Sequence, residues 1–340
     1  MTVSRIKLLL IFSILLAAGL ALGTVSGFFL KDRLYPQKPA RRYLEIRQGG
    51  FRYINPLLEC EIAGEAMENN ELMPFRPEVE KAVAVVINKK WADDISVYFR
   101  ELNNGPWFSV GPMETYAPAS LMKVPLMVAI LKEADADPSF LKKQIRFDSD
   151  IDYSSVQVFK PLKTLRRGDS YSVAELLHRM IAYSDNNSSM LLEQTANVEL
   201  LRRTYHDLDI RSPYVPKAED YISVNNYSSI FRILFNASYL SKQMSEKALG
   251  YLAESDFKQG LVGGLPQGVA VAHKFGEWES GDNKEIKELH DCGIVYYPNY
   301  PYLLCVMTKG RSFEFLDDAI RNISHVVYEG IRLQHEKRRQ

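Results

Sequence analysis

The sequence has few or none of the features that mark several large functional classes. It has three cysteines and no Cys-x-x-Cys string, which excludes a disulfide framework, and it has no His-Glu-x-x-His string or cluster of His and Cys that predicts a metal site. Lys plus Arg number 42, as do Asp plus Glu, so the net charge is zero and the basic excess of a nucleic-acid binder is missing. A Gly-x-Ser-x-Gly nucleophile string is also absent. We therefore expect no metal, no cofactor and no nucleic-acid partner.

Long runs without a charged residue are also rare in the sequence, and one lies near the N-terminus. Residues 8–30 are 23 residues without a charge. As a helix this run is about 34 Å long, against a hydrocarbon core of about 30 Å. Arg5 and Lys7 precede this run, which favours a topology with residues 1–7 in the cytoplasm. The chain after residue 30 would then lie outside the cytoplasm, in the periplasm or on the cell surface. We expect a single-pass membrane anchor, with a cleaved signal peptide as the alternative.

The rest of the chain passes from a proline-rich stretch to strands, helices and strands again. Prolines and glycines break residues 31–80, which we expect to be a stalk with at most one short strand at residues 51–54. Strand patterns are found at residues 83–87, 95–100, 268–275, 292–297 and 302–308, and residues 315–331 form a closing amphipathic helix. This order predicts an α/β (α+β) domain over residues 81–335, an antiparallel sheet flanked by helices with an all-α insertion at about 121–265.

Two of the three cysteines lie in the apolar stretches that we expect to be adjacent strands. Cys292 and Cys305 are separated by a tight turn rich in proline and asparagine. Small buried hydrophobic side chains explain both positions, and one disulfide between them is the open alternative.

The chemistry is carried by three short motifs, which are Ser120-Leu-Met-Lys123, Ser184-Asp-Asn186 and Lys274-Phe-Gly276. Four Ser-x-x-Lys strings occur, but only the one at Ser120 leads into a long apolar helix. A spacing of three is nearly one helical turn, so Lys123 lies on the same face as Ser120. A partly desolvated lysine can activate a serine hydroxyl, and a helix N-terminus can stabilise an oxyanion.

Each motif taken alone also has a purely structural interpretation. A helix cap accounts for Ser120, an Asx turn accounts for the Ser-Asp-Asn triplet, and a lysine that blunts an edge strand accounts for Lys274. The order and spacing of all three together favour a catalytic interpretation.

Together the motifs resemble the Ser-x-x-Lys, Ser-Asp-Asn and Lys-Thr-Gly set of class A β-lactamases and penicillin-binding proteins, over about residues 82–331. This resemblance implies a β-lactamase/transpeptidase-like fold. It also implies that Ser120 is the acylated nucleophile, Lys123 a general base and Ser184 the proton relay to the leaving nitrogen. The backbone N–H groups of Ser120 and Glu277 would form the oxyanion hole.

The resemblance also implies the residues that hold the substrate. Asn186 would bind the substrate amide carbonyl, Lys274 would supply positive potential, and Gly276 would let the substrate approach the strand. Tyr153 falls near the family's aromatic residue at the entrance of the site, although an ordinary loop tyrosine explains it equally well.

Two features depart from the family pattern. The Glu-x-x-Leu-Asn string that supplies the family's deacylation base is missing, and between Asp209 and Ser223 only Glu219 and Asp220 offer carboxylates. Their alternative is a pair of solvated loop charges. Phe275 replaces the usual threonine or serine, and the next strand carries His290 instead of an arginine.

We therefore expect a membrane-anchored extracytoplasmic serine hydrolase that acts on a β-lactam or D-alanyl-peptide type amide or ester, with doubtful turnover of β-lactams. The substrate would be a small molecule or peptidoglycan-like. The alternative is a catalytically weak or inactive envelope protein of the same fold that binds peptidoglycan or a protein partner.

Overall fold

The computed structural model describes residues 45–60, 75–103, 105–111, 113–211, 220–280 and 284–337, together with Leu16, Gly19 and Leu20. Residues 45–60 and 64–340 form one compact unit, and residues 1–44 with 61–63 form another. No helix in the described part of the chain is long and apolar enough to cross a membrane. Apart from three residues, the expected anchor at residues 8–30 lies outside that part.

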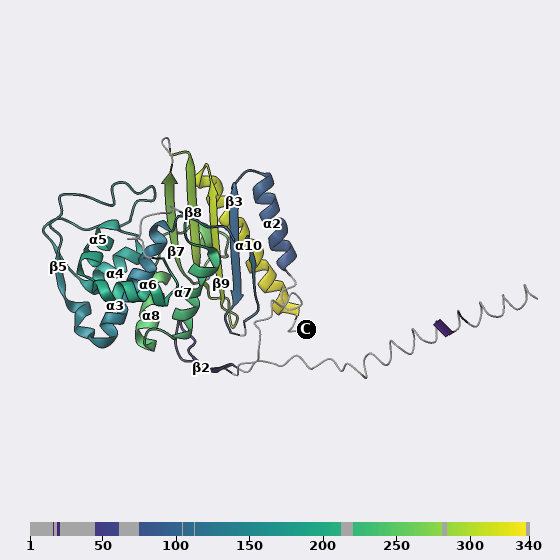
Figure 1. Cartoon of the computed structure of the whole chain (residues 1–340), viewed down its shortest axis with the longest axis horizontal. Helices are drawn as coiled ribbons and strands as arrows, with labels where there is room; N and C mark the ends of the chain where they lie inside the picture. Colours follow the sequence, from purple (N-terminus) through teal and green to yellow (C-terminus); the bar gives the residue numbers. More distant parts are fainter. Residues whose placement is uncertain are drawn as a thin grey trace, which may run out of the picture. The chain divides into compact units, whose positions relative to one another are not determined.

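The secondary structure of the compact unit alternates between blocks of strands and blocks of helices (Figure 1). The elements are β1 (Glu45–Arg47), β2 (Leu57–Cys60), α2 (Arg76–Asn88), β3 (Asp94–Glu101), β4 (Trp107–Val110), the 3-10 helix η2 (Ala119–Met122), α3 (Lys123–Ala136), the 3-10 helix η3 (Pro138–Lys142), β5 (Gln144–Arg146), β6 (Ser170–Ser172), α4 (Val173–Ala182), α5 (Asn186–Thr195), α6 (Val198–Asp207), α7 (Val224–Asn236), α8 (Lys242–Ala253), α9 (Gly260–Gly263), β7 (Val271–Ser280), β8 (Ile286–Val295), β9 (Tyr302–Gly310) and α10 (Phe313–Lys337).

The central sheet is antiparallel and has the order β4-β3-β9-β8-β7. The chain leaves the sheet after β4, builds helices α3 to α9, and returns as β7. The closing strand β9 then pairs with β3 over the whole length of β3. The predicted antiparallel sheet with a helical insertion is therefore confirmed, and β7 is left as an edge strand.

Both faces of the sheet are covered, so the first six residues of β9 read as a continuous apolar run. Because successive side chains of a strand point to opposite faces, Cys305 and Met307 of β9 join the core that contains α3, α4 and α7. Leu304 and Val306 join the core that contains α2 and α10. The nucleophile segment η2 lies on the first of these faces, against β7.

The structure of the N-terminal part differs from what the sequence predicts. Residues 83–87, predicted as a strand, lie in α2, whose buried positions Val79, Ala82 and Val86 have helical spacing. The same helix crosses the expected domain start at residue 81. Residues 51–54 form no strand; β1 and β2 pair with each other around them. Residues 45–60 belong to the compact unit, where the Glu246 carboxylate of α8 accepts the backbone N–H groups of residues 52–54.

Candidate functional site

The predicted nucleophile lies in a tight turn that leads directly into a buried helix. Ser120 is in η2, and α3 begins at Lys123. The turn is held from both sides: Leu121 is fully buried, and its carbonyl accepts a hydrogen bond from the Tyr227 hydroxyl at 3.0 Å. The predicted spacing is confirmed, because Lys123 Nζ lies 3.0 Å from Ser120 Oγ.

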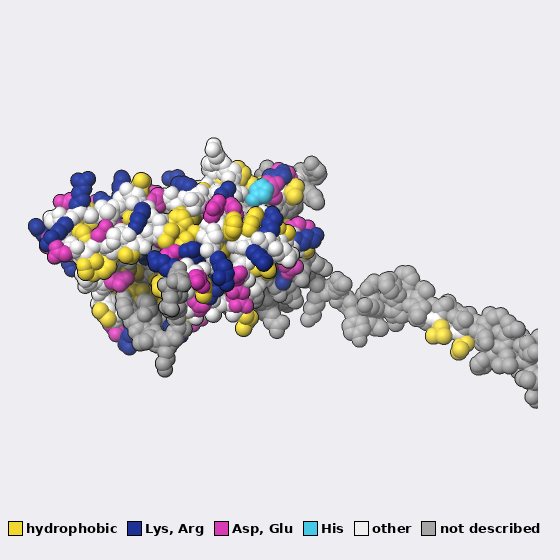
Figure 2. Space-filling view, turned by 90° about the horizontal axis from the view of Figure 1, so that it is seen from above, with side chains coloured by type: hydrophobic (Ala, Val, Ile, Leu, Met, Phe, Trp, Pro, Cys, Tyr) yellow, Lys and Arg dark blue, Asp and Glu magenta, His cyan; other side chains and the backbone are white. Residues whose placement is uncertain are grey.

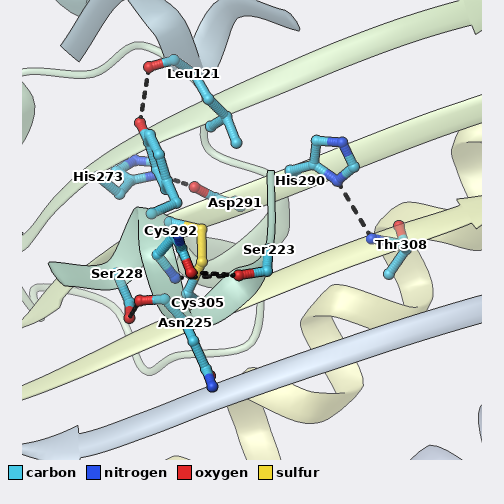
Figure 3. The surroundings of a disulfide bond; sticks show 12 residues. Leu121, Ser223, Asn225, Ser228, His273, His290, Asp291, Cys292, Cys305 and Thr308 are labelled. Atoms are coloured by element: carbon cyan, nitrogen blue, oxygen red, sulfur yellow. Dashed lines mark hydrogen bonds and ion pairs between the residues drawn. A yellow bond between two sulfur atoms is a disulfide. The ribbon is translucent and has the colours of Figure 1, made fainter. Parts of the chain in front are cut away.

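The segment before the turn is clamped to β8 by two buried side chains. Glu288 Oε2 accepts a hydrogen bond from Ala117 N at 2.9 Å, and His290 Nε2 lies 3.0 Å from Ala117 O. Thr308 N donates to His290 Nδ1 at 3.3 Å (Figure 3). A ring nitrogen that faces a carbonyl oxygen must donate and one that faces an N–H must accept, so the geometry fixes the Nε2–H tautomer. His290 thus supports the nucleophile segment.

Gly276 allows η2 to approach the edge strand β7. A Cβ atom at this position would lie 3.0 Å from Leu121 Cγ and 3.1 Å from Pro118 O. Any side chain there would push the nucleophile turn away from the strand. The close approach sets the turn that contains Ser120 against Gly276, the residue before Glu277.

Lys123 is the centre of the hydrogen-bond network. Its Nζ lies 2.6 Å from Ser184 O, 3.1 Å from Ser184 Oγ and 2.6 Å from Asn186 Oδ1, besides the contact with Ser120. Burial lowers the pKa of Lys123 from 10.5 to about 7, although Asp185 and other carboxylates oppose the shift. A lysine with this pKa exists partly as the free amine at neutral pH and can accept a proton.

A second buried lysine meets the same serine. Lys274 Nζ donates to Ser184 Oγ at 2.9 Å and to Phe275 O at 2.8 Å, and the side chain is fully buried. Burial, together with repulsion from Lys123, holds the pKa of Lys274 well below its ordinary value. Ser184 Oγ therefore bridges two amines of low basicity. Ser184 has φ of 55°, a left-handed conformation that is costly for a residue with a Cβ.

Asp185 holds this strained turn in place. The fully buried carboxylate caps α5 by accepting a hydrogen bond from Ser188 N at 2.9 Å. It also accepts hydrogen bonds from the hydroxyls of Ser154 and Thr164, each at 2.7 Å. Ser154 Oγ in turn accepts Asn186 N at 3.0 Å. These contacts explain why an aspartate stands between the two residues that meet Lys123.

Several residues of this network carry no motif and were missed by the sequence analysis. Gln157 Nε2 donates to Ser184 O at 3.0 Å, and its buried Oε1 accepts no hydrogen bond from the described residues. Asn187 accepts Tyr153 N at 2.8 Å and donates to Asp152 Oδ1, also at 2.8 Å. No spacing in the sequence links these positions to the motifs.

The Glu277 side chain has a role that the resemblance does not imply. Its carboxylate accepts hydrogen bonds from Val158 N at 2.8 Å and Phe159 N at 2.9 Å, which ties the loop after β5 to the edge strand. Burial raises the pKa of this carboxyl, against the lowering effect of the two N–H donors and the site lysines.

Phe275 points away from the nucleophile. Its ring stacks on Phe257 with centroids 4.1 Å apart and meets Phe159 edge-on at 5.8 Å. The cluster belongs to the core on the α10 face of the sheet. Phe275 meets the lysine network in two ways: its carbonyl accepts a hydrogen bond from Lys274 Nζ, and the same Nζ lies 4.2 Å from the centroid of its ring.

The remaining predicted residues lie at the margin. The Tyr153 side chain is exposed, and its carbonyl accepts Asn186 Nδ2 at 3.1 Å. Glu219 lies outside the described residues. Asp220 forms an ion pair with Lys309, which also reaches Glu288 at 3.2 Å.

The open question about the cysteines has a definite answer. Cys292 and Cys305 are directly opposite each other in β8 and β9 and are joined by a disulfide (Figure 3). Cys292 is also the register partner of Lys274. The bond therefore links β9 to β8, the strand that pairs with β7 and so with the third motif.

Comparisons with known proteins agree with this arrangement. Residues 78–331 match the model of a family described as the beta-lactamase enzyme family. No curated protein sequence matches the chain. Similar solved structures include a beta-lactamase from Chitinophaga pinensis, with 19% identity, a TM-score of 0.64 and coverage of 75% of this chain and 99% of that one.

Two further structures have the same fold. A class A beta-lactamase representative from Bacteroides cellulosilyticus has 19% identity and a TM-score of 0.64, with 76% of this chain and 98% of that one covered. PBP-A has 19% identity and a TM-score of 0.63, with coverage of 76% and 96%. At this level of identity the likeness concerns the fold alone.

Proposed function

The chain belongs to the β-lactamase enzyme family, and from that premise we propose that it is a serine hydrolase that acts through an acyl-enzyme on Ser120. The observation that carries the proposal is the position of Lys123 Nζ, which lies within hydrogen-bond distance of both Ser120 Oγ and Ser184 Oγ. The low pKa of this lysine supports the same role.

In the proposed acylation step, neutral Lys123 takes the Ser120 proton while Oγ attacks the substrate carbonyl carbon. The backbone N–H groups of Ser120 and Glu277 hold the oxyanion. When the carbon–nitrogen bond breaks, the leaving nitrogen takes a proton from Ser184, which is restored from Lys123. Lys274 holds Ser184 Oγ in position for this transfer.

The substrate that we propose is a β-lactam or a D-alanyl-peptide type amide or ester. Asn186 would contact its amide carbonyl and Tyr153 would line the entrance. We also propose that the chain is anchored by residues 8–30 with the hydrolase unit outside the cytoplasm. The uncharged run and the preceding Arg5 and Lys7 support this topology.

Deacylation is the weak step of the proposed cycle. The charge of Asp220 is engaged by Lys309, so this carboxylate is poorly placed to activate a water at Ser120. Loss of a general base typically reduces a rate by a factor of about a hundred to ten thousand. We therefore propose that a β-lactam leaves a long-lived adduct, whereas an ester or peptide substrate turns over.

Intact-mass measurement tests the proposal directly. The full chain is incubated with benzylpenicillin or, separately, with a fluorophosphonate probe that reacts with activated serines. One adduct is expected with each reagent, and Ser120→Ala should abolish both. Ser139→Ala is the matched control, because Ser139 leads another Ser-x-x-Lys string but is tied to Asp137 at 2.7 Å. A fluorophosphonate adduct that survives Ser120→Ala would disprove the assignment. The absence of both adducts would favour the non-catalytic alternative.

A further inference from the structure

The loop between β5 and β6 exposes an unusual number of apolar side chains. Over the twelve residues from 151 to 162, five large hydrophobic side chains have 39 to 80% of their surface exposed, and these are Ile151, Tyr153, Val156, Val158 and Leu162. Single exposed apolar residues are common on proteins, but a contiguous group marks an interaction site. We call residues 151–162 the apolar loop.

The exposure is built into the fold, because the backbone of the apolar loop is attached to the core. Tyr153 N donates to Asn187, and Val158 N donates to Glu277 on β7. Leu162 N donates to Asp256 at 3.3 Å, beyond the end of α8. Because these hydrogen bonds fix the backbone, the five large hydrophobic side chains remain exposed to solvent. Val156, which is 80% exposed, lies between two of these attachment points.

The charged side chains of residues 156–167 have one sign, whereas the acidic Asp150 and Asp152 precede them. Residues 156–167 contain Lys160, Lys163, Arg166 and Arg167 and no acidic residue, although the whole chain is neutral. All four cationic side chains are exposed, and Arg167 is paired with Asp150. Figure 1 draws the loop along the upper left of the compact unit. Figure 2 looks down on that side and shows hydrophobic and Lys or Arg side chains there, with some Asp or Glu side chains among them.

We propose that the apolar loop, with Lys160 and Lys163, docks on the surface of an anionic lipid bilayer. Apolar side chains can enter the boundary between headgroups and acyl chains while neighbouring cations meet lipid phosphates. Charge complementarity selects this partner over an apolar protein surface, since Lys160, Lys163 and Arg166, which form no ion pair with a described residue, would have to be desolvated there. Docking places the entrance of the Ser120 site near the bilayer, because Tyr153 belongs to both. The inference does not depend on the hydrolase activity.

The test places a fluorophore on the loop of the full chain. In a Cys60→Ser background, Val156→Cys is labelled with the polarity-sensitive dye NBD and the chain is reconstituted in lipid nanodiscs. The discs contain phosphatidylcholine alone or phosphatidylcholine with phosphatidylglycerol. Val198→Cys is the matched control, because Val198 is 77% exposed at the start of α6 and has the acidic Glu199 next to it.

We expect a blue shift and higher emission from position 156 in the phosphatidylglycerol discs alone, and no change at position 198. Lys160→Gln with Lys163→Gln should lower the ratio of docked to undocked loop about 30-fold, because each basic residue contributes about 1 kcal/mol and 1.4 kcal/mol is a tenfold change. The proposal is overturned if the emission at position 156 is the same with and without the anionic lipid, or if the emission at position 198 changes equally. It is also overturned if the double substitution leaves the emission at position 156 unchanged. Unchanged emission at position 156 would favour a protein as the partner of the apolar loop.

Discussion

The pH dependence of acylation follows directly from the surroundings of Lys123. An ordinary lysine with a pKa of 10.5 is deprotonated at pH 7 in about 0.03% of molecules, whereas one with a pKa of about 7 is deprotonated in about half, a gain of more than a thousandfold in competent base. We therefore expect the acylation rate to fall about tenfold per pH unit below pH 6 and to level off above pH 8.

The measurement is the second-order rate constant of acylation by a fluorescent penicillin, followed by stopped flow from about pH 5 to pH 9. The fluorophosphonate probe gives a second profile with a different leaving group. A shared inflection near pH 7 reports the enzyme and not the reagent. Lys123→Arg should be inactive at every pH in this range, because a guanidinium stays protonated.

A flat profile, or one that is still rising at pH 9, would refute the argument. The first outcome means that another group accepts the proton. The second means that the amine is hydrated in solution and keeps its ordinary pKa. Circular dichroism at each pH separates these results from acid unfolding.

Four further results are expected. The free energy of unfolding should rise in urea titrations from pH 7 to pH 10, because the unfolded pKa values of Lys123 and Lys274 lie above the folded ones and the unfolded chain binds more protons in that range. Glu277→Gln removes a charge that raises the pKa of Lys123, so the inflection of the stopped-flow profile should move to lower pH. Phe275→Ala should cost about 3–5 kcal/mol of unfolding free energy in urea, because it deletes a buried ring, while the folded fraction still acylates. Asp220→Asn should leave the lifetime of the penicillin adduct unchanged by mass spectrometry; a longer lifetime would identify Asp220 as the deacylation base.

The sheet and the motif positions could be predicted because each rests on a local pattern. The strand β9 is an uninterrupted apolar run, as expected for a strand with both faces covered. Helix α4 begins with Ser172 as its cap, and Glu175 N donates to the hydroxyl, as the capping-box pattern predicts. By contrast, the β-branched run from Val83 to Ile87 suggested a strand, but Val85 and Ile87 are exposed and the helical spacing of the buried residues decides the structure.

The parts of the site that could not be predicted are those in which a residue acts through a neighbour. Gln157 and Ser154 touch only the second motif, and the loop that carries them is placed by bonds to Asp185 and Glu277, far away in the sequence. Gln157 and Ser154 nevertheless hydrogen-bond to Ser184 and Asn186, two residues that contact Lys123. A buried lysine amine is stable only where acceptors surround it, and three of the acceptors around Lys123 belong to Ser184 and Asn186. The strained turn that presents them depends on the Asp185 network. The motifs name the groups that we propose to react, and contacts from the loop between β5 and β6 hold Ser184 and Asn186 where they meet Lys123.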